Sequence, residues 1–542
     1  MLVYRDLSRK TTGPALVAGL EGCLARGAQV TLEALLRAGE LECAVADAGA
    51  VEVSSAMDIS DVLGQALLGS AGATAAKLRA ALRACTCVRD LTVRRPEGYA
   101  FYALDPWAYS ALAREHAARS TRPVVVIGVR SIGTSLSALV RATFEAQGIG
   151  AERLTVRPGG HPFQRRLAFS DEQRRRLEPH VDTRDFVIVD EGPGLSGSTF
   201  LSVAEALVGL GVPASRVTCF TSHPGAPERW LAEDAVRRAS RFTWRAASGW
   251  SAPAGALDLS AGRWRERVYA SRVAFPACWG THERVKYLSA DGERLVKFAG
   301  LAPYDEGVRG RAEAVSCSGW SPPASRAEPG FSSRLWRAGR CADPARDRAA
   351  AIPVLARYLA FRSRECRAPA AASRALEEMA RVNVREQFAV DLPAEFRLEA
   401  PSPIWADARL MAHEWIVMDG GAWMKTDAAD HADDHFFPGP TDIAWDVAGA
   451  LVEWAFDDDE SASLLRAFHA RAGDSVSGRL GPYLVAYPAA LLGQALLAES
   501  TAPDAEEAAR WSSEISRYRA ALARALRALG LTPRGPQAAQ NP

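Results

Sequence analysis

Residues 187–199 read VIVDEGPGLSGST, and this stretch decides the fold class of the first half of the chain. It opens with a β-branched apolar run that predicts a buried strand, and continues with two adjacent acids, Asp190 and Glu191. A turn rich in glycine and hydroxyl side chains follows, and residues 200–209 then show the apolar spacing of a helix. A strand, a Gly-rich turn and a helix in this order are typical of an α/β parallel sheet, where ligands bind at the carboxyl ends of the strands.

Neighbouring segments extend the same sheet. The run VVVIGV at residues 124–129 predicts a second buried strand, and residues 153–157 and 216–222 predict two more. Residues 136–147 have helical spacing between the first two strands, so strands and helices alternate as a parallel sheet requires. Residues 32–46 and 75–84 read as amphipathic helices, and we expect a helical extension or cap over residues 1–84.

The turn after the acid pair has the chemistry of a phosphate site. Its backbone N–H groups and the start of the following helix can hold a phosphate, while two carboxylates can accept hydrogen bonds from ribose hydroxyls. A competing interpretation is a P-loop, because Gly192 and Gly197 are spaced as in that motif, but Ser198 stands where the P-loop lysine belongs. A Gly-rich turn without a ligand is the other alternative.

This stretch resembles the phosphoribosyl-pyrophosphate motif of type I phosphoribosyltransferases, and residues 130–134 (RSIGT) resemble their pyrophosphate loop. The resemblance implies that Asp190 and Glu191 are catalytic, holding the ribose hydroxyls and stabilising oxocarbenium-like charge. It implies, with Mg2+ bridging, a phosphate- and sugar-binding set made of Gly194, Ser196, Gly197, Ser198, Thr199, Arg130, Ser131 and Gly133. The turn between the acids and Ser196 is one residue longer than the family's usual turn.

Between these motifs lies a basic segment, RPGGHPFQRR, at residues 157–166. In the enzymes that the motifs resemble, a mobile loop in this region can cover the pyrophosphate. Arg157, His161, Arg165 and Arg166 could do so through charge-assisted hydrogen bonds. A solvated basic loop is the alternative.

The second half of the chain has a different pattern. Residues 284–288 and 294–298 predict a β-hairpin turned by Asp291-Gly292, and its second strand carries Lys297. Downstream come WADARLMAH at 405–413, Asp427, and GPTDIAWDVA at 439–448. From about residue 345 the pattern is mostly helical, which predicts an α+β domain.

This series resembles aminoglycoside phosphotransferase-type small-molecule kinases. The resemblance implies a kinase-like domain in which Asp407 is the catalytic base, Asp427 and His413 bind the metal, and Lys297 pairs with nucleotide phosphates. The chain departs from the family pattern because Trp405-Ala406 replaces His-Gly, His413 replaces Asn, and no Gly-rich phosphate loop is present. The segment DHADDH at 430–435 is a further candidate for divalent metal or, alternatively, a solvated acidic loop.

Composition bounds the remaining possibilities. The 542 residues carry a net charge of +1, which disfavours a dedicated nucleic-acid coat. No run approaches a bilayer span, no signal peptide is seen, and nine scattered cysteines favour reduced thiols, so we expect a cytoplasmic protein without a membrane partner. The predicted organisation is an extension (1–84), a phosphoribosyltransferase-like domain (85–245), a linker (246–265), a kinase-like domain (266–530) and a disordered tail (531–542).

The leading functional hypothesis is a bifunctional enzyme that uses phosphoribosyl pyrophosphate and ATP with Mg2+ and acts on small phosphorylated or nucleoside-like molecules. The alternative is a ligand-binding regulator whose kinase-like half is a pseudokinase, suggested by the departures around Asp190 and Asp407. A nucleic-acid or partner-binding scaffold is a third class, with the fourteen tryptophans as its main support.

Overall fold

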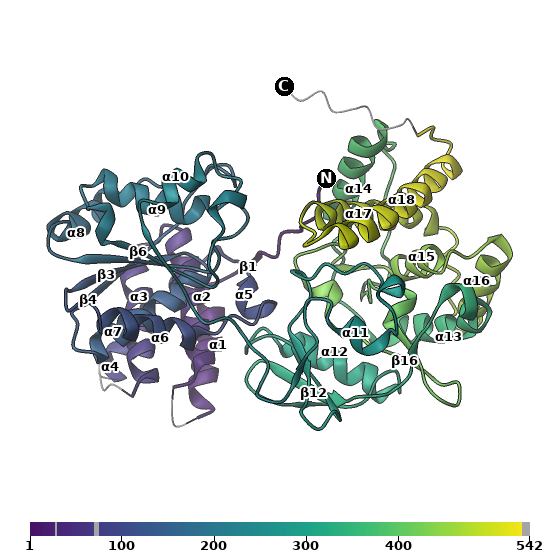
Figure 1. Ribbon diagram of the computed structural model, residues 1–542, viewed down its shortest axis with the longest axis horizontal. Coiled ribbons are helices and arrows are strands. Elements are labelled where there is room, and N and C mark those ends of the chain that lie inside the picture. Colours follow the sequence, from purple (N-terminus) through teal and green to yellow (C-terminus); the bar gives the residue numbers. More distant parts are fainter. Residues whose placement is uncertain (28–29, 70–74, 534–542) are drawn as a thin grey trace. The chain divides into compact units, whose positions relative to one another are not determined.

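The computed structural model describes residues 1–27, 30–69 and 75–533, so residues 534–542 of the predicted tail lie outside the described residues (Figure 1). The chain forms two compact units. The parallel-sheet unit comprises Leu7–Ser251 and Gly300–Tyr304, and the antiparallel-sheet unit comprises Met1–Asp6, Ala252–Ala299 and Asp305–Pro542. Each unit is described by itself below.

The parallel-sheet unit is built on five parallel strands in the order β4-β3-β5-β6-β7. Their bounds are β3 (Val124–Val129), β4 (Ala151–Val156), β5 (Asp185–Val189), β6 (Val217–Thr221) and β7 (Thr243–Ala246). The four strands predicted from the sequence are confirmed, and β7 is an addition. The strand order reverses between β3 and β5, and ligands bind at such a switch point in open α/β sheets.

Helices cover both faces of this sheet. Figure 1 shows α9 on one face and α6 and α7 on the other. The helices are α1 (Gly13–Ala25), α2 (Leu32–Asp47), α3 (Val53–Leu67), α4 (Ala75–Cys85), α5 (Glu97–Ala100), α6 (Pro106–Ala117), α7 (Ile132–Ala146), α8 (Asp171–Leu177), α9 (Ser198–Gly209) and α10 (Ala235–Ala239). A small antiparallel pair, β1 (Arg9–Thr11) and β2 (Leu91–Val93), completes the unit.

The first four helices are an integral part of the parallel-sheet unit, which differs from the expected extension over residues 1–84. Their apolar side chains form one core with Ala138 and Leu139 of α7. Arg153 of β4, whose side chain is 0% exposed, pairs through both Nη atoms with Glu42 of α2 at 2.9 Å and through Nε with Asp61 of α3 at 2.6 Å. A buried ion pair of this kind fixes helix and strand together, because either charge alone would be costly to bury.

The antiparallel-sheet unit contains a five-stranded antiparallel sheet in the order β11-β12-β10-β9-β8. Its strands are β8 (Leu257–Asp258), β9 (Lys286–Leu288), β10 (Arg294–Phe298), β11 (Ala324–Arg326) and β12 (Phe331–Leu335). The predicted hairpin is confirmed as β9 and β10, with Lys297 opposite Lys286. The prediction of a linker at 246–265 is corrected here, because β8 lies within that range and pairs with β9 inside the sheet.

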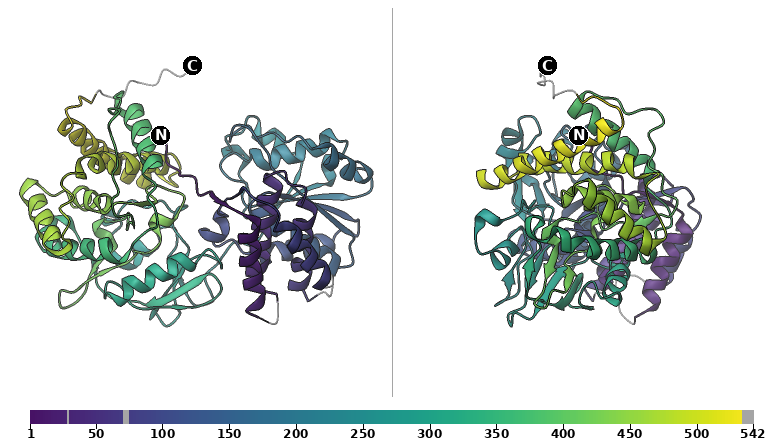
Figure 2. Two further views of the ribbon diagram at one scale, coloured as in Figure 1. Left: turned by 180° about the vertical axis from the view of Figure 1, so that it is seen from behind. Right: turned by 90° about the vertical axis from the view of Figure 1, so that its right-hand side faces the viewer.

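The rest of this unit is mainly helical, as predicted. Its helices are α11 (Trp264–Val268), α12 (Glu306–Cys317), α13 (Pro344–Glu365), α14 (Ser373–Phe388), α15 (Ile443–Glu453), α16 (Asp458–Ala472), α17 (Leu480–Ser500) and α18 (Ala505–Ala528). Short strands form two small sheets: β13 (Arg340–Cys341), β15 (Trp415–Val417) and β16 (Trp423–Lys425) form one, and β14 (Ile404–Trp405) and β17 (Pro440–Thr441) form the other. Figure 2 shows α18, in yellow, running beside α17.

Helix α17 bears on the expectation that no segment is long and apolar enough to span a bilayer. By length and composition it passes that test among the described residues, so the expectation is wrong on this point. However, 72% of its apolar window is buried inside the unit. Its residues Tyr483, Val485 and Leu492 belong to the large hydrophobic core of this unit, as in a core helix.

Candidate functional site

The two predicted motifs of the parallel-sheet unit meet at the switch point of its sheet. Asp190 directly follows β5, and the backbone N–H groups of Glu191 and Gly133 act to lower the pKa of its carboxyl group, against the effect of burial. Gly133 lies in the first turn of α7, after β3. A Cβ on Gly133 would lie 2.3 Å from the carbonyl oxygen of Val189, so only glycine allows this close approach. The acid pair and the predicted pyrophosphate loop therefore form one site.

Asp190 and Glu191 lack enough nearby cations to offset their burial. Burial raises the pKa of each to about 8, and for Glu191 the neighbouring Asp190 and Glu97 raise it further. The N–H of Gly98 and the N–H groups at Asp190 oppose this rise. Carboxyl groups in this state gain most from a ligand that supplies hydroxyl donors or a cation.

The hydroxyl-rich turn lies at the start of α9 and is covered by the basic segment. Ser196 and Ser198 both donate hydrogen bonds to the carbonyl oxygen of Pro162, at 3.0 and 2.6 Å. Gly197 is the N-cap, with φ +64°, and a Cβ there would lie 2.2 Å from the ring of Trp230. The structure places the remaining predicted members in the same turn, Gly194 exposed and Thr199 half-buried in the first turn of α9.

The predicted pyrophosphate-binding arginine points toward α2. Arg130 donates to the carbonyl oxygen of Ala46 at 3.2 Å and to Asp47 at 3.3 Å. Ser131 has φ +103°, a strained value for a residue with a side chain, and such strain is common at ligand loops. Of the basic segment, Arg157 also pairs with Asp47, while Arg165 donates to the carbonyl oxygen of Gly160. Asp47 was not foreseen from the sequence.

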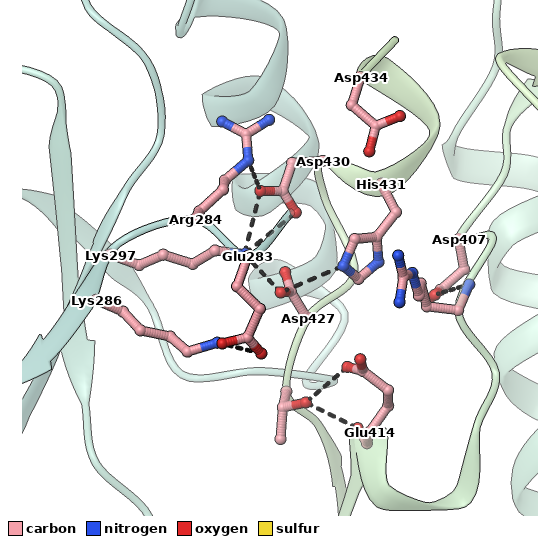
Figure 3. A network of polar contacts seen from close by, with 12 residues as sticks. Glu283, Arg284, Lys286, Lys297, Asp407, Glu414, Asp427, Asp430, His431 and Asp434 are labelled. Atoms are coloured by element: carbon pink, nitrogen blue, oxygen red, sulfur yellow. Dashed lines mark hydrogen bonds and ion pairs between the residues drawn. The ribbon is translucent and has the colours of Figure 1, made fainter. Parts of the chain in front are cut away.

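The antiparallel-sheet unit holds a cavity of about 200 Å³. Lys297 of β10 and Lys286 of β9 line it from the sheet, and Asp427 and Asp430 line it from the segment after β16. Because directly opposite residues of an antiparallel pair share a face, the register Lys297↔Lys286 brings both ammonium groups to the cavity. Lys297 Nζ lies 2.5 Å from Asp427 Oδ2 and 3.1 Å from Asp430 Oδ2, as Figure 3 shows.

Three side chains in this cavity could share a divalent cation. Asp427, Asp430 and His431 each offer a ligand atom, and these atoms lie within 4.8 Å of one another. His431 Nε2 is 3.4 Å from Asp427 Oδ2, and Arg284 Nε is 2.6 Å from Asp430 Oδ2. Two carboxylates and one imidazole fit a divalent cation, and in the present geometry Lys297 and Arg284 balance the acids instead.

The acids of this cavity are stabilised in their charged form. Although burial opposes it, Lys297 and His431 hold the pKa of Asp427 well below its usual value. Burial also acts to raise the pKa values of Glu414 and Asp434. Lys425 and His431 nevertheless lower the pKa of Glu414 to about 2, and His282 lowers that of Asp434 to about 2. The cavity is therefore a charge-balanced network of carboxylates, lysines and imidazoles (Figure 3).

The structure does not place Asp407 as the expected catalytic base. Asp407 is 1% exposed and is not among the residues that line the cavity. One carboxyl oxygen accepts from the hydroxyl of Tyr358, and the other accepts from the N–H of Arg409 and lies 3.4 Å from Lys425 Nζ. Asp446 of α15 in turn accepts from the backbone N–H groups of Asp407 and Ala408. In this geometry Asp407 holds its loop and Lys425 in place.

His413 is also placed differently from the expectation. It lines the cavity, where its ring stacks on Trp264 at 6.0 Å between centroids, but it is not in the group that could share a cation. Among the described residues that group takes its imidazole from His431 instead. Part of the DHADDH segment therefore has the metal-binding potential that the sequence suggested, while its Asp433 pairs with Arg311 at 2.5 Å.

Comparisons with known proteins add small-molecule kinases as distant neighbours of part of this chain. No protein-family model and no curated protein matches it. Among solved structures, a choline/ethanolamine kinase family protein from Mesorhizobium loti matches at 16% identity and TM-score 0.32, covering 49% of this chain and 98% of that chain. Choline kinase LicA from Streptococcus pneumoniae matches at 14% identity and TM-score 0.32, covering 44% of this chain and 89% of that chain.

An aminoglycoside phosphotransferase crystallised with ADP and hygromycin B matches at 11% identity and TM-score 0.24, covering 43% of this chain and 89% of that chain. At these scores the likenesses carry no argument about this protein. The inferences that follow rest on its own residues.

Proposed function

We propose that the protein is a two-headed transferase. The antiparallel-sheet unit binds ATP with a divalent cation and transfers its phosphoryl group to a small molecule. The parallel-sheet unit binds phosphoribosyl pyrophosphate and transfers its phosphoribosyl group. The ligands of both units are small phosphorylated molecules.

The observation that carries the first half is the convergence of Lys297 with Asp427, Asp430 and His431 on one cavity. Phosphoryl transfer depends on positioning and on cations that offset the charge of the phosphates. Lys297 and Lys286 supply fixed positive charge from the sheet, and Asp427, Asp430 and His431 would hold Mg2+ or Mn2+, which would offset phosphate charge. A cation at Asp427 would leave the Lys297 ammonium free to contact a phosphate.

This half is tested by titrating ATP and Mg2+ into the protein by calorimetry and by following phosphoryl transfer from labelled ATP to a panel of small hydroxyl compounds. Asp427→Asn should abolish the metal-dependent part of ATP binding and lower any turnover by about 10²–10³-fold. Asp419→Asn, in the exposed turn between β15 and β16, is the matched control and should behave as wild type. ATP binding that is unaltered by Asp427→Asn would reject the assignment.

The second half rests on the close approach of Gly133, in the first turn of α7, to Val189, the last residue of β5, at the switch point of the sheet. This contact places an acid pair, suited to ribose hydroxyls, between a loop at α7 and a hydroxyl-rich turn at α9, both suited to phosphate. Asp190 and Glu191 would hold the ribose and stabilise positive charge that develops at its C1.

Phosphoribosyl pyrophosphate binding to the wild type, and its loss in Asp190→Asn and Glu191→Gln, would support this assignment. Asp182→Asn, an exposed aspartate before β5, is the control. If the wild type does not bind phosphoribosyl pyrophosphate with Mg2+, the second head has no such ligand.

A second candidate function is a regulator that binds both ligands without turnover. One observation favours it. Both carboxyl oxygens of Asp407, the expected catalytic base, accept hydrogen bonds inside the protein, and one of them also pairs with Lys425. It predicts thermal stabilisation by ATP and phosphoribosyl pyrophosphate with no product from either. Product formation that is lost in Asp427→Asn would exclude it.

We further propose a reducing, cytoplasmic location. All nine cysteines are free, and six of them are buried. Disulfides are rare in reducing compartments, so unpaired buried thiols are the expected state there.

A further inference from the structure

The last turn of α2 occupies the donors that the parallel-sheet unit would offer to a pyrophosphate. Asp47, the final residue of α2, accepts from Arg157 Nε at 2.7 Å through Oδ1, and its Oδ2 lies 2.6 Å from Arg157 Nη2. The same carboxylate lies 3.3 Å from Arg130 Nη1. One acid therefore holds two guanidinium groups, which come from the ends of β3 and β4.

Two further groups of the same helix turn contact these arginines. Cys43, one turn before Asp47, accepts through its sulfur from Arg157 Nη2 at 3.2 Å. Arg130 also donates to the carbonyl oxygen of Ala46 at 3.2 Å. The side chains of Arg130 and Arg157 thus both contact the last two turns of α2.

Helix geometry alone does not favour an acid at this position. The carboxyl end of a helix carries partial negative charge, so an aspartate there is unfavourable unless cations compensate. Arg130 and Arg157 provide that compensation, while the Nε of Arg130 is buried without a partner among the described residues. The Asp47 carboxylate therefore holds both arginines, but it does not satisfy every N–H donor of Arg130.

A bidentate guanidinium and a second guanidinium around one carboxylate form an arrangement that can also hold a phosphate group. Arg130 directly follows β3, Arg157 directly follows β4, and Asp190 directly follows the neighbouring strand β5. The two arginines held by Asp47 therefore start from the same carboxyl edge of the sheet as the acid pair, which is the edge where a ligand would bind.

We propose that Asp47 is an internal competitor at the pyrophosphate subsite, a specificity-determining residue that a diphosphate must displace from Arg130 and Arg157. The inference rests on the proposed phosphoribosyl-pyrophosphate function of this unit. In the present geometry both arginines are engaged by α2. The affinity of the site for small anions is kept low, and only a ligand that also contacts Asp190 and Glu191 competes well.

The test is calorimetric titration of the full-length protein with inorganic pyrophosphate and with phosphoribosyl pyrophosphate. Asp47→Asn keeps the shape of the side chain and removes its charge, so pyrophosphate should bind about tenfold or more tightly than to the wild type. Asp47→Ala should change the affinity in the same direction and serves if the first variant is unstable. Arg157→Met in the Asp47→Asn background should cancel the gain.

Glu33→Gln is the matched control, because Glu33 lies on the same helix and is also shared by two arginines, Arg26 and Arg37, at 2.6 and 2.8 Å. It should leave the affinity for pyrophosphate unchanged. If Asp47→Asn and Asp47→Ala bind pyrophosphate as the wild type does or more weakly, while Asp190→Asn still abolishes binding of phosphoribosyl pyrophosphate, Asp47 is not a competitor and the proposed function stands. If neither the wild type nor these variants bind either ligand, the proposed function fails, and the inference fails with it.

Discussion

Buried carboxyl groups behave in opposite ways in the two units. In the parallel-sheet unit, burial raises the pKa of Asp190 and of Glu191 to about 8, and the neighbouring Asp190 adds to the rise at Glu191. In the antiparallel-sheet unit, lysines and imidazoles hold the pKa of Asp427 well below its usual value and that of Glu414 at about 2, although burial acts against them. Buried carboxyl groups thus lack enough cationic partners in the parallel-sheet unit, whereas in the antiparallel-sheet unit they already have them.

The difference shows how each site would respond to its ligand. The cavity around Asp427 is already charge-balanced, so a divalent cation entering it must compete with Lys297. The acid pair at Asp190 has no such competitor, and there the competition lies on the anion side, between a pyrophosphate and Asp47. In each site a protein side chain pairs with the residues that a charged ligand group would contact in the proposed complex. Lys297 stands in place of the divalent cation, and Asp47 stands in place of the pyrophosphate.

The largest loss of stability is expected when one partner of the buried Arg153–Glu42 ion pair is removed. Arg153→Met leaves Glu42 buried without its partner, which should cost about 3–5 kcal/mol. For a unit of this size that lowers the melting temperature by about 6–20 °C. Calorimetry should show one transition shifted, and this transition then identifies the parallel-sheet unit. Arg122→Met, whose pair with Asp185 at 3.5 Å is partly exposed, is the control and should shift it little. An equal loss in both variants would contradict the assigned role of Arg153.

Lys297→Met separates the two competitors in the cavity. Without the ammonium, Asp427 and Asp430 both lose their pair with Lys297, and Asp430 keeps only its pair with Arg284, so affinity for Mn2+ alone should rise about tenfold, while affinity for ATP should fall about tenfold. Titration with each ligand separately measures both. Arg294→Met, on the same strand but bonded to Ser333 and Ser325, should change neither value. A parallel fall of both affinities would show that Lys297 is needed only to hold the cavity together.

A smaller effect should appear in the pH dependence of the parallel-sheet unit. A folded-state pKa near 8 means that Asp190 keeps its proton when the unfolded chain has lost it. Stability contributed by this group therefore falls as pH rises from about 4 to about 8. Asp190→Asn cannot ionise, so its melting temperature should match wild type near pH 4 and exceed it increasingly toward pH 8. Asp182→Asn should show no such pH-dependent gap; a gap of constant size for Asp190→Asn would mean that the acid is not raised in pKa.

Much of the fold could be predicted because local patterns dominate it. The run at 187–189 and the run at 124–129 are so uniformly β-branched that only buried strands fit them, and the Asp291-Gly292 turn marks the hairpin that carries Lys297. Strand β7 has no comparable signal in the sequence, because Thr243–Ala246 is short and alternates polar and apolar residues over only four positions. The early helices look separate from the sheet in the sequence, because the charges that tie them to it, such as Glu42 and Arg153, are 111 residues apart.

The sites were predictable in part for the same reason. The neighbours of Asp190 in the turn and loop are local motifs, but Asp47 is 110 residues from Arg157 and belongs to no motif. In the second half, a pattern counted along the chain suggested Asp407 and His413. The contact of Asp407 with Tyr358 of α13 turns it away from the cavity, and His431 offers its ring nitrogen beside Asp427. Which side chain enters a cavity depends on packing between distant segments, and spacing does not record it.

The central claim is that one chain carries two separate phosphate-handling sites. The most direct test is to titrate ATP with Mg2+, and separately phosphoribosyl pyrophosphate with Mg2+, into the wild type, Asp427→Asn and Asp190→Asn. We expect the wild type to bind both ligands, Asp427→Asn to lose only ATP, and Asp190→Asn to lose only phosphoribosyl pyrophosphate. A wild type that binds neither ligand, or a single variant that loses both while remaining folded, would contradict it.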